Sequence, residues 1–335
     1  MFGHLGPDFI TKYRTMPEIT VLMSVYNGER WIIDSINSVL SQSEDDFEFI
    51  IINDGSTDDT AWILDSYNDE RLVIINQNNV GLTKSLNTGL SIAKGNFIAR
   101  IDADDICMPD RLYEQKKFLV DNPDVVLVGS NAILIDEKNN EVGHSVYPVS
   151  SVTLIERLRS FQPVFPHSSI FFRKEIINRE GGYNPYFERS QDFELLLRLS
   201  EKYLIAGLDE FLIKFRLNNN SLSYGSNDLQ LKMGIAALIC YYRREIELKD
   251  FSISHYDDWL VFFRKVEDWL VTKNFSKRRE AKKKFRHCRM LFRQKEFLKA
   301  LSALFASFRS DNTFFLYRGI NLNSSRDFEP FLHQL

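Results

Sequence analysis

Three aspartates in the order D-x-D-D stand where a short apolar run ends: Asp102, Asp104 and Asp105. Residues 97–101 have the composition of a buried strand, and Pro109 permits a helix to begin shortly afterwards. Carboxylates this close together repel one another unless a cation neutralises them. All-oxygen ligands on a tight turn suit Mg²⁺ or Mn²⁺, hard ions that also bind phosphate oxygens. Taken alone, the segment also fits a solvated turn whose acids cap a helix.

Polar residues also follow two earlier apolar runs. Tyr26 and Asn27 come after residues 19–25, and Asp54 comes after residues 47–52. Asp54 could accept a hydrogen bond from the N–H of a nucleobase. The surrounding NDGSTDDT is rich in capping residues, so a helix-capping turn is the alternative interpretation. No G-x-G-x-x-G follows the first run, which argues against a nicotinamide or flavin enzyme.

Apolar runs of strand length alternate with amphipathic helices in the first part of the chain. Strands are predicted at residues 19–25, 47–52, 72–75, 97–101 and 125–128, with a helix after each of the first three. This alternation predicts an α/β fold with a doubly wound, mainly parallel sheet. Because ligands of such sheets bind beyond the carboxyl ends of the strands, the polar residues above are expected to meet at one site.

The composition is that of a folded soluble protein. The chain has 335 residues, of which 44% are hydrophobic and 26% charged, with a formal net charge of -4. This length accommodates one large α/β domain and a smaller unit, and the charge gives no sign of nucleic-acid binding. Cys107, Cys240 and Cys288 form no C-x-x-C pair, which argues against a disulfide framework or zinc site and favours a reducing cytoplasm.

The N-terminal sequence lacks the apolar core of a signal peptide. In addition, no apolar run approaches the roughly 20 residues that span a bilayer. We therefore expect any membrane association to be peripheral.

A second group of candidate residues lies in the stretch 181–203. Gly181 and Gly182 predict a turn, and the leucine face of the helix that follows places Asp192 in its first turn. A helix N-terminus stabilises a carboxylate in that position, although acids in first turns are also common without any function. The preceding Gln191 is neutral, so no adjacent like charge is expected to raise the pKa of Asp192.

Several motifs resemble those of the family 2 glycosyltransferases, which have the GT-A fold. They are SVYNGERWIIDSINSVLSQ, FEFIIINDGSTDDT, NVGLTKSLNTGLSIAKGNFIARIDADD and PHSSIFFRKE, in that order. The resemblance covers roughly residues 18–225. It implies transfer of a sugar from a nucleotide-diphosphate donor, with inversion at the anomeric carbon and with Mg²⁺ or Mn²⁺ as the cofactor.

The same resemblance implies roles for residues of the donor side. Asp54 matches the family's base-recognising aspartate, and the segment Asp102, Ala103, Asp104 matches its metal-binding D-x-D. Tyr26 would lie along the nucleobase or ribose. Further donor-binding candidates are Asn27, Lys84, Asn87 and Arg100, of which Lys84 could equally be a solvated helix residue.

On the acceptor side, the resemblance implies that Asp192 is the catalytic general base. Gln191 replaces the first acid of the family's E-D pair, and both Gln191 and His167 are acceptor-binding candidates. His167 could instead be a structural polar residue. Arg216 lies in the segment that approaches the pyrophosphate, while Asn218 stands where a histidine is common, which leaves a third protein ligand to the metal in doubt.

The composition changes to amphipathic helical segments after about residue 229. Helices are predicted at 229–248, 256–272 and 277–308, which gives a leader at 1–17, a GT-A domain at 18–225 and a C-terminal helical region at 229–335. The third segment is strongly basic, with few acids and interleaved aromatics. It could lie on an anionic membrane surface, or its aromatics could pack inside a helical subdomain. Its basic residues are Lys277, Arg278, Arg279, Lys282, Lys283, Lys284, Arg286, Arg289, Arg293, Lys295 and Lys299.

The sequence thus favours a cytoplasmic, inverting enzyme of the hexosyltransferase type that acts in bacterial surface polysaccharide synthesis (O-antigen, capsule or lipopolysaccharide). It would move one sugar from a nucleotide-diphosphate sugar to a hydroxyl of a glycan or lipid-linked acceptor. UDP is the first choice of nucleotide, and dTDP and GDP are the alternatives, because thymine and guanine could also present an N–H to Asp54. A Q-x-x-R-W motif and membrane helices, which processive relatives carry, are not found. One alternative is a sugar-phosphate nucleotidyltransferase, although SVYNGER is a poor match to its phosphate loop. The other is a catalytically silent nucleotide-sugar-binding scaffold, against which the intact acids speak.

Overall fold

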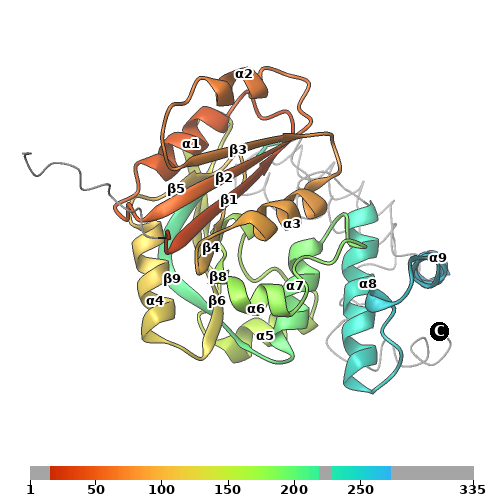
Figure 1. The fold of residues 1–335 in the computed structure, drawn as a ribbon. Helices are drawn as coiled ribbons and strands as arrows, with labels where there is room; N and C mark the ends of the chain where they lie inside the picture. The colour runs from red at the N-terminus through yellow and green to blue at the C-terminus, as the bar shows by residue number, and fades with distance from the viewer. Residues whose placement is uncertain (1–15, 219–227, 273–335) are drawn as a thin grey trace, which may run out of the picture.

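The computed structural model describes residues 16–218 and 228–272, and these form an α/β structure built on one sheet (Figure 1). The strand order is β3-β2-β1-β4-β8-β6-β9-β5, and β7 pairs with β6. The strands are β1 (Ile19–Val25), β2 (Phe47–Asp54), β3 (Leu72–Gln77), β4 (Phe97–Arg100), β5 (Ile106–Cys107), β6 (Val125–Ile135), β7 (Glu141–Ser145), β8 (Phe171–Arg173) and β9 (Leu204–Arg216).

The first half of the sheet is parallel, as the sequence predicts. β1 pairs in parallel with both β2 and β4, and β2 pairs in parallel with β3. Every residue of β1 and β2 is buried, because helices cover both faces of these strands and their sequences are almost continuously apolar. The predicted α/β class with a parallel sheet in this part of the chain is confirmed.

The second half of the sheet is mixed. β8 runs antiparallel between β4 and β6, while β9 pairs in parallel with β6 and antiparallel with β5. β6 extends well beyond the predicted residues 125–128, and β5, β7 and β9 were not predicted at all. Ile106 and Cys107 of β5 pair with Lys214 and Ile213 of β9. This pairing brings the acidic loop before β5 next to the end of β9.

Helices cover the two faces of the sheet in two groups. Side chains of α1, α2 and α4 pack with one face, and side chains of α3, α5, α6, α7 and α8 pack with the other. Residues 150–165, where the sequence patterns above predict no helix, contain α5. The helices are α1 (Ile32–Leu40), α2 (Thr60–Asp65), α3 (Leu82–Ile92), α4 (Arg111–Asp121), α5 (Ser151–Arg159), α6 (Lys174–Arg179), α7 (Gln191–Ser200), α8 (Asp228–Glu245) and α9 (Tyr256–Thr272).

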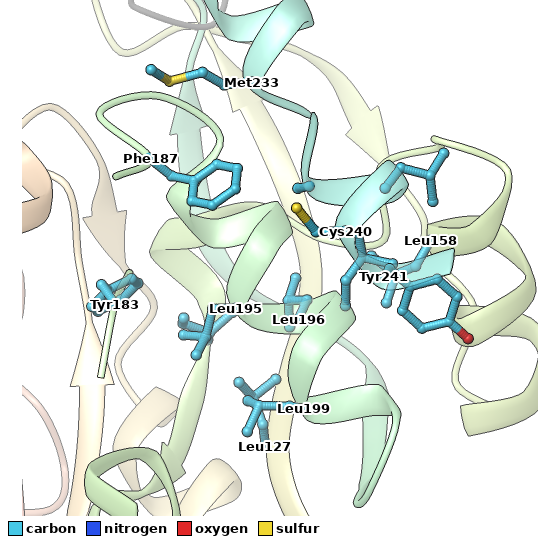
Figure 2. Close-up of a cluster of buried hydrophobic side chains, with 14 of the residues drawn as sticks. Leu127, Leu158, Tyr183, Phe187, Leu195, Leu196, Leu199, Met233, Cys240 and Tyr241 are labelled. Atoms are coloured by element: carbon cyan, nitrogen blue, oxygen red, sulfur yellow. The ribbon is translucent and has the colours of Figure 1, made fainter. Parts of the chain in front are cut away.

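Of the two C-terminal helices that are described, α8 lies beside α7 and α9 lies on the far side of α8, both on the side of the molecule away from α4 (Figure 1). In Figure 2, Leu195 and Leu196 of α7 lie in one apolar cluster with Cys240 and Tyr241 of α8. The helix predicted at 277–308 lies outside the described residues, and so does most of the leader at 1–17. Among the helices of residues 16–218 and 228–272, none has the length and apolar character needed to cross a membrane.

Candidate active site

The loops after β1 and β2 are joined by hydrogen bonds at the carboxyl ends of these strands. The backbone N–H of Asn27 donates to Ser56 Oγ at 2.9 Å, and Asn27 Oδ1 accepts from the N–H of Thr57 at 2.8 Å. Asn27 adopts a positive φ of 55°, which an Asn tolerates better than most residues. The neighbouring Tyr26 is 53% exposed, so its ring is accessible to a ligand beside these loops.

Asp54 is buried at the end of β2 and organises the loop that precedes α3. Its Oδ1 accepts from Gln77 Nε2 at 2.8 Å and from the N–H of Val80 at 2.9 Å, and its Oδ2 accepts from the N–H of Gly81 at 2.9 Å. Burial alone would raise the pKa of Asp54, but these hydrogen bonds outweigh it and lower the pKa below its usual value. Asp54 is therefore ionised, and because Ser85 also contributes a hydrogen bond, the protein itself supplies most of the roughly four hydrogen bonds that a carboxylate can accept.

The acids after β4 form one compact cluster. Ligand oxygens of Asp102, Asp104 and Asp105 all lie within 4.8 Å of one another. Asp102 forms an ion pair with the buried Arg100, and its Oδ2 accepts from Ser168 Oγ at 2.9 Å. Burial opposes ionisation of Asp102, but the charge of Arg100 prevails and holds the pKa of Asp102 below its usual value.

The other two acids of the cluster resist ionisation. Burial, followed by the charge of Asp102, raises the pKa of Asp104 to about 6. Burial and the charges of its two acidic neighbours raise the pKa of Asp105 well above its usual value. Asp105 Oδ1 accepts from the N–H of Arg216 at 2.8 Å, whereas its buried Oδ2 has no hydrogen-bond partner in the described part of the chain.

These observations fit a divalent cation better than a solvated turn. Clustered, partly buried carboxylates with raised pKa values and an orphaned oxygen are costly unless a positive ion lies among them. An all-carboxylate set suits Mg²⁺ or Mn²⁺ rather than a soft metal. Asp102 and Asp104, which both keep some exposure, are the residues that would hold it.

Arg216 ends β9 directly behind the cluster. Its Nε donates to the carbonyl of Asp104 at 2.8 Å, and its Nη1 donates to the carbonyl of Asp136 at 2.9 Å. Asn218 Nδ2 donates to Asp104 Oδ2 at 3.4 Å. Arg216 and Asn218, both candidates from the sequence, therefore lie at the acidic cluster, and Asn218 contacts Asp104 directly.

His167 lies in the short turn before β8 and forms a pair with Tyr183. Its Nε2 and the hydroxyl oxygen of Tyr183 are 2.8 Å apart, and both rings are in edge-to-face contact. Burial, reinforced by the charge of Arg100, lowers the pKa of His167 well below its usual value. The imidazole is therefore neutral, suited to hydrogen bonding rather than to charge pairing.

Asp192 lies in the first turn of α7, as predicted, but the prediction for its pKa is wrong in direction. Burial raises the pKa of Asp192, and the charge of Asp102 adds to this effect. The N–H of Phe193 and the charge of Arg100 act in the opposite sense without cancelling it. The neutral Gln191 spares Asp192 a like charge in sequence, yet the fold supplies one from the acidic cluster. Asp192 and the cluster thus lie within electrostatic range of one another.

The remaining predicted residues differ in their surroundings. Asn87 is committed to structure, since its Nδ2 donates to the carbonyl of Tyr183 at 2.7 Å and its Oδ1 accepts from the N–H of Tyr183 at 2.9 Å. Lys84 is exposed on α3. Ala103 lies within the acidic loop and Gln191 is buried at the start of α7.

Sequence reasoning missed two residues that the structure brings to the site. Ser168 accepts from the N–H of Asp102 at 3.0 Å and from Arg100 Nη1 at 3.2 Å, so it couples β4 to the turn before β8. Tyr183 connects His167 to Asn87. The local sequences PHSS and GGY do not identify Ser168 or Tyr183 as site residues, because the residues that they contact are distant in sequence.

The sequence profile of glycosyl transferase family 2 matches residues 20–181. The O-antigen biosynthesis glycosyltransferase WbnJ of Escherichia coli is 33% identical over 214 residues, which cover 62% of this chain and 83% of that protein. The amylovoran biosynthesis glycosyltransferase AmsE of Erwinia amylovora is 31% identical, covering 61% of this chain and 78% of that protein.

Among solved structures, S. aureus TarS 1–349 in complex with UDP-GlcNAc has the same fold, with a TM-score of 0.58 at 17% identity over 94% of this chain and 86% of that one. The mixed α/β sheet of this chain is thus that of the GT-A fold. The sequence matches show more than the fold, because WbnJ is 33% identical over most of its length. This chain belongs to the family 2 glycosyltransferases.

Proposed function

We propose that this protein is an inverting transferase that moves one hexosyl unit from a nucleotide-diphosphate sugar to a hydroxyl group. The observation that carries this proposal is the arrangement around Arg100, which pairs with Asp102 on one side and acts on Asp192 on the other. Inversion needs a base on the acceptor side and charge stabilisation on the leaving-group side. Family membership favours glycosyl transfer over the nucleotidyltransferase and silent-scaffold alternatives.

In this proposal Asp192 removes the proton of the attacking hydroxyl. Its raised pKa brings it closer to the working pH, where a general base is most effective. Asp102 and Asp104 would hold Mg²⁺ or Mn²⁺, and the bound ion would supply positive charge to stabilise the departing diphosphate. His167, neutral and fixed by Tyr183, and Gln191 orient the acceptor.

We further propose that UDP is the donor nucleotide and that Tyr26, Asn27 and Asp54 bind its nucleoside. The negative charge of Asp54 at the end of β2 suits the N3–H of uracil, and TarS is a protein of the same fold crystallised with UDP and with UDP-GlcNAc. Arg100 and Arg216 supply positive charge to the diphosphate side. The relatives from E. coli and E. amylovora are named for O-antigen and amylovoran synthesis, which supports a glycan or lipid-linked acceptor of bacterial surface polysaccharide.

Turnover of labelled UDP-sugars by Asp192→Asn tests the assignment of the base. General-base catalysis typically contributes 10²- to 10⁴-fold, so Asp192→Asn should lower kcat by roughly that factor. Donor affinity, measured by calorimetry on the same preparation, should stay nearly unchanged. Glu188→Gln removes an exposed acid from the preceding loop and is the matched control. Near-native turnover by Asp192→Asn, or a loss confined to Glu188→Gln, would show that another acid is the base.

We also propose that the enzyme works at the cytoplasmic face of a membrane, where the basic residues 277–299 attract anionic lipid. The full chain should co-sediment with anionic but not with neutral vesicles at low salt. Raising the ionic strength should release it, because salt screens exposed charges over about 8 Å. Replacement of Lys282, Lys283 and Lys284 by Gln should weaken this binding while leaving turnover of a soluble acceptor intact. Equal sedimentation with both vesicle types would contradict the proposal.

A further inference from the structure

The guanidinium of Arg216 is fixed from several directions. Its Nε and Nη1 donate to the carbonyls of Asp104 and Asp136, and its backbone N–H donates to Asp105. The ring of Trp31 lies 5.4 Å from its Cζ, at cation–π distance. Arg216 as a whole is only 1% exposed. Holding one long side chain by so many contacts costs rotamer entropy. The contacts therefore indicate that the guanidinium of Arg216 is needed in one defined position.

One nitrogen of this guanidinium is left over. Nη2 of Arg216 is buried and has no hydrogen-bond partner in residues 16–218 and 228–272. A buried donor without a partner costs stability unless a ligand supplies the acceptor. The acceptor that fits a cation beside a three-carboxylate cluster is an oxygen of a phosphate group, which also binds the metal that such a cluster would hold.

Trp31 is itself anchored at the start of α1. Its indole N–H donates to the carbonyl of Glu137 at 3.4 Å, and the neighbouring Arg30 pairs with Glu137 Oε2 at 2.6 Å. Asn139 Nδ2 donates to Asp34 Oδ2 at 2.9 Å. The turn between β6 and β7 is thereby tied to the first turn of α1. Trp31 and the carbonyl of Asp136 consequently approach Arg216 from one connected unit.

We propose that Trp31 is a positioning residue that holds Arg216 Nη2 ready to bind the diphosphate of the donor. This inference rests on the proposed function. Trp31 does not touch the donor and acts through Arg216. The indole face favours the charged guanidinium over other contacts and excludes water from it, so the guanidinium keeps its orientation before the nucleotide arrives.

The test compares binding of UDP and uridine by calorimetry, with Mn²⁺ and with EDTA. Trp31→Leu should bind UDP about tenfold more weakly, as expected from the loss of a partly buried cation–π contact, while its affinity for uridine stays within about twofold of wild type. Trp31→Phe keeps an aromatic face without the bond to Glu137 and should retain most of the affinity. Trp62→Leu, which removes a 74% exposed tryptophan from α2, should change neither affinity.

A double-mutant cycle shows whether Trp31 acts through Arg216. In an Arg216→Gln background, Trp31→Leu should weaken UDP binding no further. Equal UDP binding by wild type and Trp31→Leu would overturn the inference and leave the proposed function intact. Proportional loss of uridine binding, or loss of Mn²⁺ binding alone, would also overturn it, because Trp31 would then support the loops in general. Failure of wild type to bind UDP, GDP or dTDP would reject the proposed function and this inference together.

Discussion

Arg100 is the charge on which the candidate site depends most. Its side chain is 1% exposed, and it forms an ion pair with Asp102 and a hydrogen bond with Ser168. A guanidinium stays protonated under all ordinary conditions, so burying it requires nearby negative charge. Because Arg100 also favours ionisation of Asp192 and disfavours protonation of His167, it links the acidic cluster electrostatically to these two side chains.

Metal binding is expected to depend on pH through Asp104, whose pKa is raised to about 6. Because the folded pKa lies above the unfolded value, the metal-free protein loses stability from this group as pH rises towards about 6. A cation binds only the deprotonated carboxylate, so its stabilising effect grows over the same range. The rise in Tm on adding Mn²⁺ should therefore be larger at about pH 7.5 than at about pH 5.

Asp104→Asn is the control for this measurement. The substitution replaces the carboxylate of Asp104, which is both the group that takes up the competing proton and one ligand of the metal. The rise in Tm with Mn²⁺ should therefore be small at both pH values. An Mn²⁺ effect that is equal at the two pH values in wild type would contradict a role for Asp104 as a ligand.

Helix α3 is attached by side-chain hydrogen bonds to the turn that carries Tyr183. Asn87 bonds both the N–H and the carbonyl of Tyr183, and Thr83 Oγ1 donates to the carbonyl of Phe187 at 2.7 Å. Gly182 adopts a φ of +71° in this turn, and an added Cβ would meet Asn87 Oδ1 at 2.7 Å. The position of the His167–Tyr183 pair thus depends on α3, even though no residue of α3 is part of the pair.

Asn87→Ala should lower the free energy of unfolding by about 2 to 4 kcal/mol, because it leaves two backbone groups of Tyr183 without partners. Chemical denaturation monitored by circular dichroism measures this change. Lys84→Ala, on the exposed face of the same helix, should stay within about 0.5 kcal/mol of wild type. If Asn87→Ala instead keeps full stability and loses donor affinity, the sequence-based assignment of Asn87 to donor binding is correct.

Sequence patterns predicted the strands that have the same kind of surroundings along their whole length. β1 and β2 are apolar on both faces, and their strand character is evident from composition alone. β9 was missed because its pairing changes along its length: it pairs in parallel with β6 throughout and adds β5 only near Ile213, with register shifts between. Such a strand has no single periodicity, since each part meets different neighbours.

The same reasoning explains which parts of the site were predicted. Asp102 and Asp104 are recognisable because both stand in one short segment. The commitment of Asn87 to Tyr183 and the rise in the pKa of Asp192 both arise from groups that are far apart in sequence. No local pattern encodes either effect.

Helix α8 belongs to the same apolar core as α7 and one face of the sheet. Its residues from Met233 to Tyr242 are buried, and Ser190 Oγ, directly before α7, donates to the carbonyl of Gln230 at 2.8 Å. Asn184 Nδ2 likewise donates to the carbonyl of Ser252 at 2.9 Å. The division into domains at 18–225 and 229–335 stays a prediction, and these contacts favour mutual dependence of the two parts.

A chain that ends at residue 225 should therefore fold poorly compared with one that ends at residue 272. Removing α8 exposes the apolar face of α7, and burial contributes about 25 cal/mol per Å² of apolar surface. Thermal unfolding and size-exclusion chromatography of the two truncated chains compare them directly. A cooperative, monomeric 1–225 fragment with native Tm would show that the first domain is independent.

The pairing of β5 with β9 has a consequence for how the protein emerges from the ribosome. Ile106 and Cys107 directly follow the acidic loop, but their strand partners are Lys214 and Ile213, and Asp105 receives its bond from Arg216. During synthesis, the parallel strands β1 to β4 can assemble well before these residues appear. The loop that carries the acids stays without its flanking strand until β9 is made. Nascent chains shorter than this should therefore lack an ordered acidic loop, because neither the strand partner of β5 nor the N–H that bonds Asp105 has yet been made.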